Sequence, residues 1–135
     1  NQTSPYWKIL DPVCVGMVNN ICETTGRRIV VHSSWVKHQD NFPDGLYNWL
    51  VDQGLKAENF HGDPLCKDIS WRYDRVTEWL SRHPEAKDFV IVDDEKPQTL
   101  DPQWVVTHLV LVDYLNGLSW ENLEAVKYGD WKKSD

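Results

Sequence analysis

Short apolar runs alternate with helical patterns along this sequence. Residues 28–34 and 88–93 are compact apolar runs, too short for helices, and each predicts a buried strand. Residues 104–112 predict a third strand on the same grounds. Apolar residues three or four positions apart predict four helices, which run from Asp11 to Gly26, from Asp44 to Gly54, from Asp68 to Arg82, and onward from Ser119.

The ends of the first helix carry the clearest local signals. Asp11 is suited to the N-cap, Pro12 to the first helical position, and Gly26 to the C-terminal stop. Residues 35–42 are polar and aromatic without a helical period, and residues 55–67 contain turn-forming residues. Both segments are predicted to be loops.

The order of these elements indicates the fold class. Helices that alternate with nearly all-apolar strands favour an α/β fold, with a mostly parallel sheet covered by helices on both faces. The length of 135 residues suits one domain over residues 1–135. We expect residues 1–10 to be an irregular segment and residues 127–135 to be a frayed tail.

Composition narrows the function classes. A net charge of −7 argues against strong non-specific nucleic-acid binding, which depends on neutralising phosphates. No apolar run is long enough to span a membrane. The three cysteines form neither a disulfide framework nor a CxxC motif, which favours a reducing, cytoplasmic setting. No spacing of histidines and cysteines predicts a zinc site.

Acidic residues at the end of one predicted strand are the main chemical signal. Asp93, Asp94 and Glu95 directly follow the apolar run Phe89–Val92. Clustered carboxylates are suited to a hard divalent cation, and ligands bind at the carboxyl edge of open α/β sheets. The alternative is a strand followed by a solvated acidic turn.

Several features in sequence order resemble the haloacid dehalogenase (HAD) superfamily. The resemblance is closest to a small branch found beside RNA-repair modules and in phage and bacterial genomes, and it covers about residues 9–126. It rests on Ile29-Val-Val-His-Ser-Ser-Trp35, on Arg72-Tyr-Asp-Arg-Val-Thr-Glu-Trp-Leu80, on Phe89-Val-Ile-Val-Asp-Asp-Glu95 and on Asn116-Gly-Leu-Ser119.

The resemblance implies a Rossmann-like, three-layer fold that catalyses Mg²⁺-dependent phosphoryl transfer. In that scheme Ser33 binds a phosphate oxygen, although a shift of one residue would select His32 or Ser34 instead. Arg72 supplies the positive charge, with Lys67 as the alternative. The metal-binding acids would be Asp93 and Asp94. We therefore treat Ser33, Arg72, Asp93 and Asp94 as candidate catalytic residues, and Ser34 and Lys67 as candidate substrate-binding residues.

The chain departs from the family pattern at its first motif. An Asp-x-Asp-Gly on a central first strand would carry the nucleophile and the general acid, but no Asp precedes Asp11. The chain also starts at Asn1 without Met, so we expect this segment to lie upstream. A degenerate, non-catalytic domain is the alternative. Without the segment, the chain is expected to be inactive as a phosphatase.

Two functional hypotheses follow from the sequence. The first is a HAD-type phosphohydrolase acting on a phosphomonoester, such as a nucleotide or a nucleic-acid end. The second is a non-catalytic HAD-like module that binds a phosphorylated ligand or a protein. Trp35, His38 and Phe42 could provide a surface for stacking a base, or they could simply pack against the domain.

Overall fold

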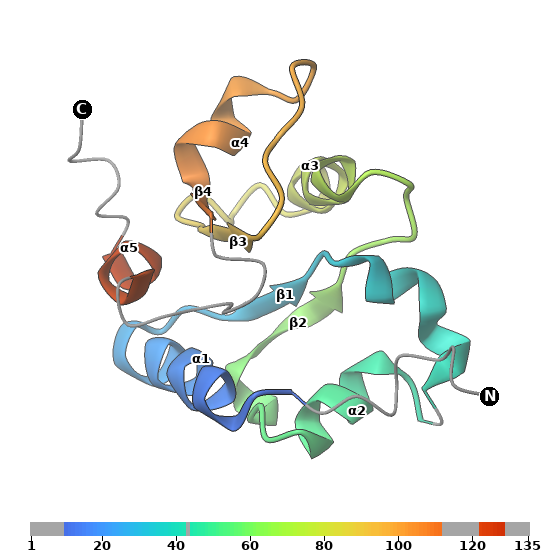
Figure 1. Cartoon of the computed structure of the whole chain (residues 1–135), viewed down its shortest axis with the longest axis vertical. Helices are drawn as coiled ribbons and strands as arrows, with labels where there is room; N and C mark the ends of the chain where they lie inside the picture. Colours follow the sequence, from blue (N-terminus) through green and yellow to red (C-terminus); the bar gives the residue numbers. More distant parts are fainter. Residues whose placement is uncertain (1–9, 43, 112–121, 129–135) are drawn as a thin grey trace.

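The computed structural model describes residues 10–42, 44–111 and 122–128 of the chain. Within these ranges, helices alternate with short strands (Figure 1). The predicted Ser119 cap and residues 129–135 of the predicted tail lie outside the described residues. The elements in order are α1 (Pro12–Thr25), β1 (Ile29–Val31), η2 (Ser34–Asn41), α2 (Leu46–Asp52), η3 (Ala57–Asn59), β2 (Phe60–Leu65), α3 (Arg72–Arg82), β3 (Ile91–Asp93), α4 (Gln103–His108), β4 (Leu109–Leu111) and α5 (Leu123–Tyr128).

Helix α1 begins and ends where its capping residues predict. The Asp11 carboxylate accepts the backbone N–H of Val13 at 2.9 Å, and Pro12 opens the helix. Gly26 adopts a left-handed conformation with φ of 80° and donates its N–H to the Cys22 carbonyl at 2.8 Å. Glycine adopts this conformation without a Cβ clash, so it ends the helix at low cost.

The first pair of strands corrects one prediction. Strand β2 lies within residues 55–67, which were predicted to be a loop, and it pairs in parallel with β1. Gly62, Asp63 and Pro64 interrupt the apolar pattern that normally marks a strand. The pairing register also shifts between Ile29 and Val31, so the strand tolerates turn-forming residues at an irregular position.

The second pair of strands, β3 and β4, corrects another prediction. Residues 104–112 were predicted to be one strand, but within the described residues 104–111 the first part belongs to α4 and the last three residues to β4. The Val105 N–H donates to the Pro102 carbonyl at 3.0 Å, which starts a helical turn after the proline. Strand β4 pairs in parallel with β3, with Ile91 opposite Leu109. The short helix α4 was missed because its β-branched residues are followed directly by β4, so the whole segment has the composition of one strand.

Smaller differences concern element boundaries. The predicted loop 35–42 is largely the 3₁₀ helix η2. Helix α3 starts at Arg72, later than the predicted start at Asp68. Helix α5 extends through Lys127 and Tyr128, into the segment predicted to be a frayed tail. None of the helices in the described ranges has the length and apolar character needed to cross a membrane.

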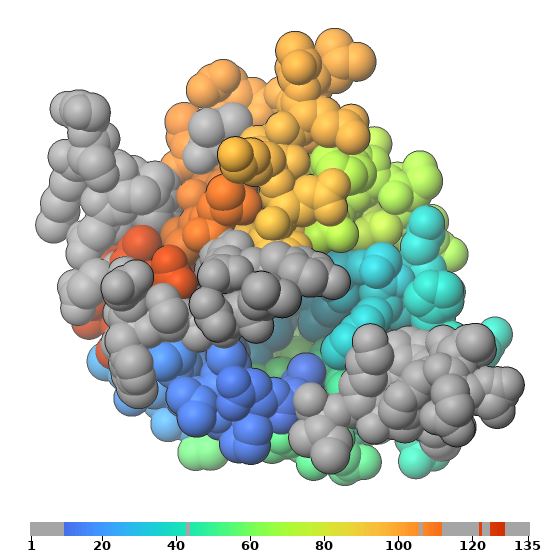
Figure 2. Space-filling view, viewed as in Figure 1, coloured from blue at the N-terminus to red at the C-terminus, as the bar shows by residue number. Residues whose placement is uncertain are grey.

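The two strand pairs lie in different parts of the molecule. Figure 1 shows β1 and β2 beside α1 and α2, with β3, β4, α3 and α4 on the other side. In the space-filling view (Figure 2) the early, blue part of the chain and the later, orange part lie on opposite sides of the surface. One hydrophobic cluster combines α1, η2, α2 and β2, and another combines α3, β3 and α4. A third cluster joins Ile21 of α1 with Val110 of β4 and Val126 of α5. The molecule is thus an α/β fold with short parallel strands.

Candidate functional site

An open pocket lies where the first strand, the third helix and the third strand meet. Its volume is about 960 Å³. Ser33 follows β1, Arg72 is the first residue of α3, and Asp94 follows β3. Segments far apart in the sequence therefore converge at one place. The lining residues are Ser33, Ser34, Trp35, Arg72, Asp94, Glu95 and Lys96.

Arg72 is the electrostatic centre of this pocket. Its Nη1 atom lies 2.6 Å from Asp93 Oδ1 and 3.7 Å from Asp94 Oδ1. Its Nη2 atom lies 3.5 Å from Glu95 Oε1. One guanidinium thus balances part of the charge of three successive carboxylates, and a planar group with several donors is suited to that task.

The acids at the end of β3 occupy different environments. Asp93 is buried, and its Oδ1 also accepts the Glu95 N–H at 3.0 Å. Asp94 lines the pocket and is partly exposed. Partial burial, followed by the neighbouring Asp93 carboxylate, raises the pKa of Asp94. A cation between the Asp93 and Asp94 carboxylates would reduce the repulsion between their negative charges.

These two acids therefore fit the Mg²⁺ that the sequence implies. Asp93 and Asp94 offer hard oxygen ligands on adjacent residues, and a cation would offset both the partial burial and the neighbouring carboxylate that raise the pKa of Asp94. Arg72 supplies part of the compensation in the protein without metal. The donor set is appropriate for a magnesium ion that keeps several waters.

Ser33 is positioned by the start of η2. Its Oγ atom accepts the Trp35 N–H at 3.3 Å, and its carbonyl accepts the Val36 N–H at 3.1 Å. The side chain is therefore an N-cap that also lines the pocket. Ser34, one residue on, lines the same pocket, so both hydroxyls named from the sequence are available there.

Lys67 lies apart from these residues. It does not line the pocket, its side chain is 63% exposed, and its Nζ atom lies 3.5 Å from Glu78 Oε2. The structure therefore brings Arg72, rather than Lys67, to the hydroxyls and acids. Lys96 supplies a second cation to the pocket, and the sequence reasoning did not consider it.

Arg75 is a residue that sequence reasoning missed. It is 2% exposed, and its Nη1 atom donates to the His32 carbonyl at 2.8 Å, directly before Ser33. Its Nε atom donates to the Ile69 carbonyl at 2.6 Å. The guanidinium thus ties the end of β1 to the segment before α3. Its position three residues after Arg72, on the same helix face, was the available signal.

His32 lies between the two strand pairs. Its Nε2 atom is 3.4 Å from the Val92 carbonyl and 3.6 Å from Asp93 Oδ2. Burial lowers the pKa of His32, against the opposing effect of the Asp93 carboxylate. Its Nδ1 atom is buried and has no hydrogen-bond partner within the described part of the chain. The ring stacks on Tyr73, with 6.3 Å between centroids.

The match to a protein family is consistent with this arrangement. A family model described as the HAD domain in Swiss Army Knife RNA repair proteins matches residues 1–123. The chain belongs to this family. Searches of curated proteins and of solved structures found no match. The HAD relationship predicted from the ordered motifs is therefore confirmed, and the roles of individual residues in this HAD domain stay predictions.

Proposed function

We propose that this HAD domain binds a phosphomonoester and acts as a Mg²⁺-dependent phosphohydrolase module. The observation that carries the proposal is the convergence of two hydroxyls, a guanidinium and a carboxylate in one open pocket. Ser33 and Ser34 supply the hydroxyls, Arg72 the guanidinium and Asp94 the carboxylate. These are the groups that phosphoryl transfer requires around a phosphate.

Each group has a distinct role in this proposal. The hydroxyls of Ser33 and Ser34 donate to phosphoryl oxygens, and Arg72 donates two parallel N–H bonds. Lys96 adds a second positive charge to the pocket. Asp93 and Asp94 would hold Mg²⁺, whose charge would offset the negative charge of the phosphoryl group. Arg75 touches no substrate and positions the backbone that carries Ser33.

The proposed substrate is a nucleotide or a nucleic-acid end. Trp35 lines the pocket beside the serines, and its partly buried ring also packs against Phe42 and Trp49. Bases stack on such rings without requiring a particular sequence. The family description refers to RNA repair proteins, which supports a nucleic-acid substrate. The net charge of −7 disfavours binding of nucleic acid at other surfaces.

Catalysis requires a nucleophile that these residues do not supply. No Asp-x-Asp occurs before α1 in the 135 residues. We therefore propose that this chain binds phosphate and metal but does not turn over a phosphomonoester without an Asp-x-Asp segment. The second candidate is a non-catalytic module that uses the same pocket for binding alone. We also propose a reducing, cytoplasmic setting, because three cysteines without a CxxC motif do not make a disulfide framework.

The test compares oligonucleotides that differ only at their end. We expect the chain to bind an RNA oligonucleotide with a terminal phosphate more tightly than one with a hydroxyl, and only with Mg²⁺ present. Arg72→Gln removes this preference, while Lys67→Gln retains it. Equal affinity for both ends would reject the proposal. Turnover of p-nitrophenyl phosphate by a form of the protein that carries an Asp-x-Asp segment, lost in Asp93→Asn, distinguishes the enzyme from the binding module.

A further inference from the structure

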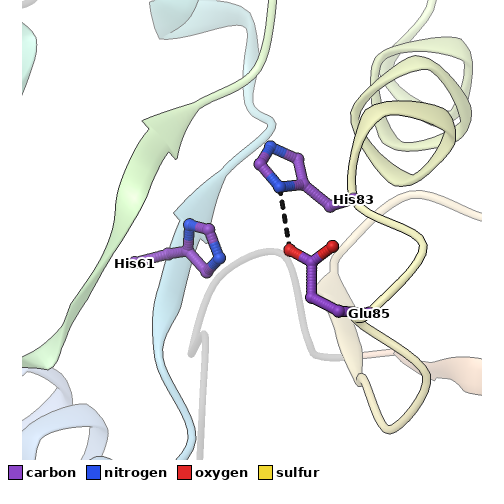
Figure 3. A group of neighbouring side chains, drawn as sticks. All are labelled: His61, His83 and Glu85. Carbon is purple, nitrogen blue, oxygen red and sulfur yellow. Dashed lines mark hydrogen bonds and ion pairs between the residues drawn. The ribbon is translucent and has the colours of Figure 1, made fainter.

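A second group of polar side chains meets at the opposite end of α3 from the pocket. His61 comes from β2, His83 directly follows α3, and Glu85 lies in the next turn (Figure 3). One ligand atom from each residue lies within 4.8 Å of the others. Neither histidine takes part in the phosphate-binding arrangement. The spacing in the sequence gives no hint of this cluster, because pairing of β2 and packing of α3 create it.

His83 is the best positioned of the three. Its Nδ1 atom faces Glu85 Oε2 at 3.1 Å, while its Nε2 atom contacts Asp63 Oδ2 at 2.8 Å. The ring also stacks on Trp79, with 4.0 Å between centroids and 23° between planes. The orientation of His83 is thus fixed from two sides, and a carboxylate on the far nitrogen is the partner that metal-binding histidines commonly have.

We propose that His61, His83 and Glu85 form a binding site for a divalent transition-metal ion, of which Zn²⁺ is the best suited. Two imidazoles and a carboxylate match zinc, whereas Mg²⁺ and Ca²⁺ prefer oxygen ligands alone. Ligands of a tetrahedral zinc ion lie about 3.3 Å apart. The 3.1 Å between His83 Nδ1 and Glu85 Oε2 is close to that spacing. Water completes the coordination of the ion.

Zinc binding rearranges two hydrogen bonds. The ion replaces the proton between His83 Nδ1 and Glu85 Oε2, and both atoms become its ligands. The second bond involves His61. His61 Nδ1 accepts the Asp63 N–H at 2.9 Å. If the ion binds His61 Nδ1, it takes the place of the Asp63 N–H. If the ion binds His61 Nε2, the ring proton lies on Nδ1, which then faces the Asp63 N–H and cannot accept it. The bond is lost in either case. A single neutral hydrogen bond contributes little compared with coordination of a transition metal, so its loss does not prevent binding.

The charges around the site favour a cation. Asp63 and Glu85 both contact His83, and Glu85 is largely exposed and free to turn towards an ion. Arg82 opposes the ion but is already paired, with its Nη1 atom 2.7 Å from Asp63 Oδ2 and its Nε atom 2.8 Å from Glu78 Oε2. Asp63 therefore stays in place as the support for His83.

This site is independent of the proposed phosphatase pocket. Arg72 begins α3 and His83 follows its last residue, so the 11-residue helix separates them by about 16 Å. An ion at the second site would join β2 to the end of α3. It would therefore stabilise the fold without entering the phosphate chemistry.

The test measures zinc binding to the reduced, chelator-treated chain by calorimetry. We expect one Zn²⁺ per chain, with affinity reduced about tenfold or more in Glu85→Gln and in His83→Gln. Glu85 is 65% exposed along its side chain, so its substitution leaves the fold intact. His38→Gln, in η2, serves as the matched control and retains the wild-type affinity. Zinc at roughly a hundredfold over its Kd also raises the Tm of wild type by about 5 °C or more.

Two results would overturn the proposal. The first is wild-type zinc affinity no greater than that of Glu85→Gln. The second comes from replacing Zn²⁺ with Co²⁺, whose absorption spectrum reports its ligands. A thiolate-to-cobalt charge-transfer band would show that cysteine, for example Cys66, holds the ion instead of the histidines. Loss of phosphate binding in Arg72→Gln leaves the zinc affinity unchanged, so the two proposals fail separately.

Discussion

Arg72 Nη1 lies 2.6 Å from Asp93 Oδ1, and this ion pair joins the first residue of α3 to the last residue of β3. Asp93 is 7% exposed, so the carboxylate depends on protein groups for compensation of its charge. The same guanidinium lines the open pocket. The side chain that compensates the buried Asp93 carboxylate is therefore also the one proposed to bind phosphate.

Arg72→Gln is expected to destabilise the fold by about 3 kcal/mol, because it leaves a buried carboxylate without its cation. The free energy of unfolding in urea measures this loss. Lys67→Gln is the matched control, since its exposed pair with Glu78 contributes at most about 1 kcal/mol. Equal losses of unfolding free energy in the two variants would show that the Arg72–Asp93 pair contributes no more than an exposed ion pair.

Arg75→Lys should reduce stability by about 2 kcal/mol and weaken phosphate binding without contacting the ligand. A lysine cannot reach the His32 and Ile69 carbonyls together, so at least one buried acceptor loses its donor. Urea unfolding and oligonucleotide binding measure the two effects. The control is Arg28→Lys, whose exposed guanidinium donates to the neighbouring Gly26 and Arg27 carbonyls. Unchanged phosphate affinity in Arg75→Lys would reject its positioning role.

Asn19→Ala should cost about 3 kcal/mol of unfolding free energy. The Asn19 side chain donates to the Gly54 carbonyl at 2.8 Å and accepts both the Lys56 N–H and the Asn59 amide. Removing it leaves buried donors and an acceptor unpaired. Chemical denaturation measures the effect, and the adjacent, exposed Asn20→Ala should stay within about 0.5 kcal/mol of wild type.

Cys66 should be the least reactive thiol of the native protein. Burial raises its pKa from 9.0 to about 12, which reduces the thiolate fraction about a thousandfold at pH 8. We expect alkylation of Cys66 to be at least about a hundredfold slower than that of Cys14, measured by mass spectrometry. In urea the rates should converge.

The raised pKa of Cys66 also makes the free energy of unfolding depend on pH. Because the pKa is higher in the folded protein than in the unfolded chain, the stabilisation from the buried neutral thiol is complete below about pH 9 and is lost as the pH rises towards 12.

Local chemistry explains which parts of the fold were predictable. Asp11, Pro12 and Gly26 set the ends of α1 through neighbouring backbone groups, so the sequence alone located them. Strand β2 owes its extended form to pairing with β1, and its Gly-Asp-Pro segment signals a turn. Tertiary pairing overrode the local signal there. Helix α4 was missed for another reason, because its apolar residues run directly into β4 and together resemble one strand.

The candidate site likewise contains residues that the sequence predicted and residues that only the structure revealed. Ser33, Arg72 and Asp94 were named from motif order, and the structure brings them together because the ends of β1 and β3 and the start of α3 meet at the pocket. Arg75 and the His61–His83–Glu85 cluster depend on burial and on contacts between distant segments. Neither burial nor distant contacts leave a spacing that can be read along the chain.

The separation of β1–β2 from β3–β4 has a consequence for motion. Within the described ranges each pair has its own backbone hydrogen bonds, and side chains such as His32 link them. The β3–β4 pair can therefore open without breaking any ladder bond of β1–β2. Native-state amide exchange should resolve two cooperative units with different opening free energies, and the pocket lies on the boundary between them.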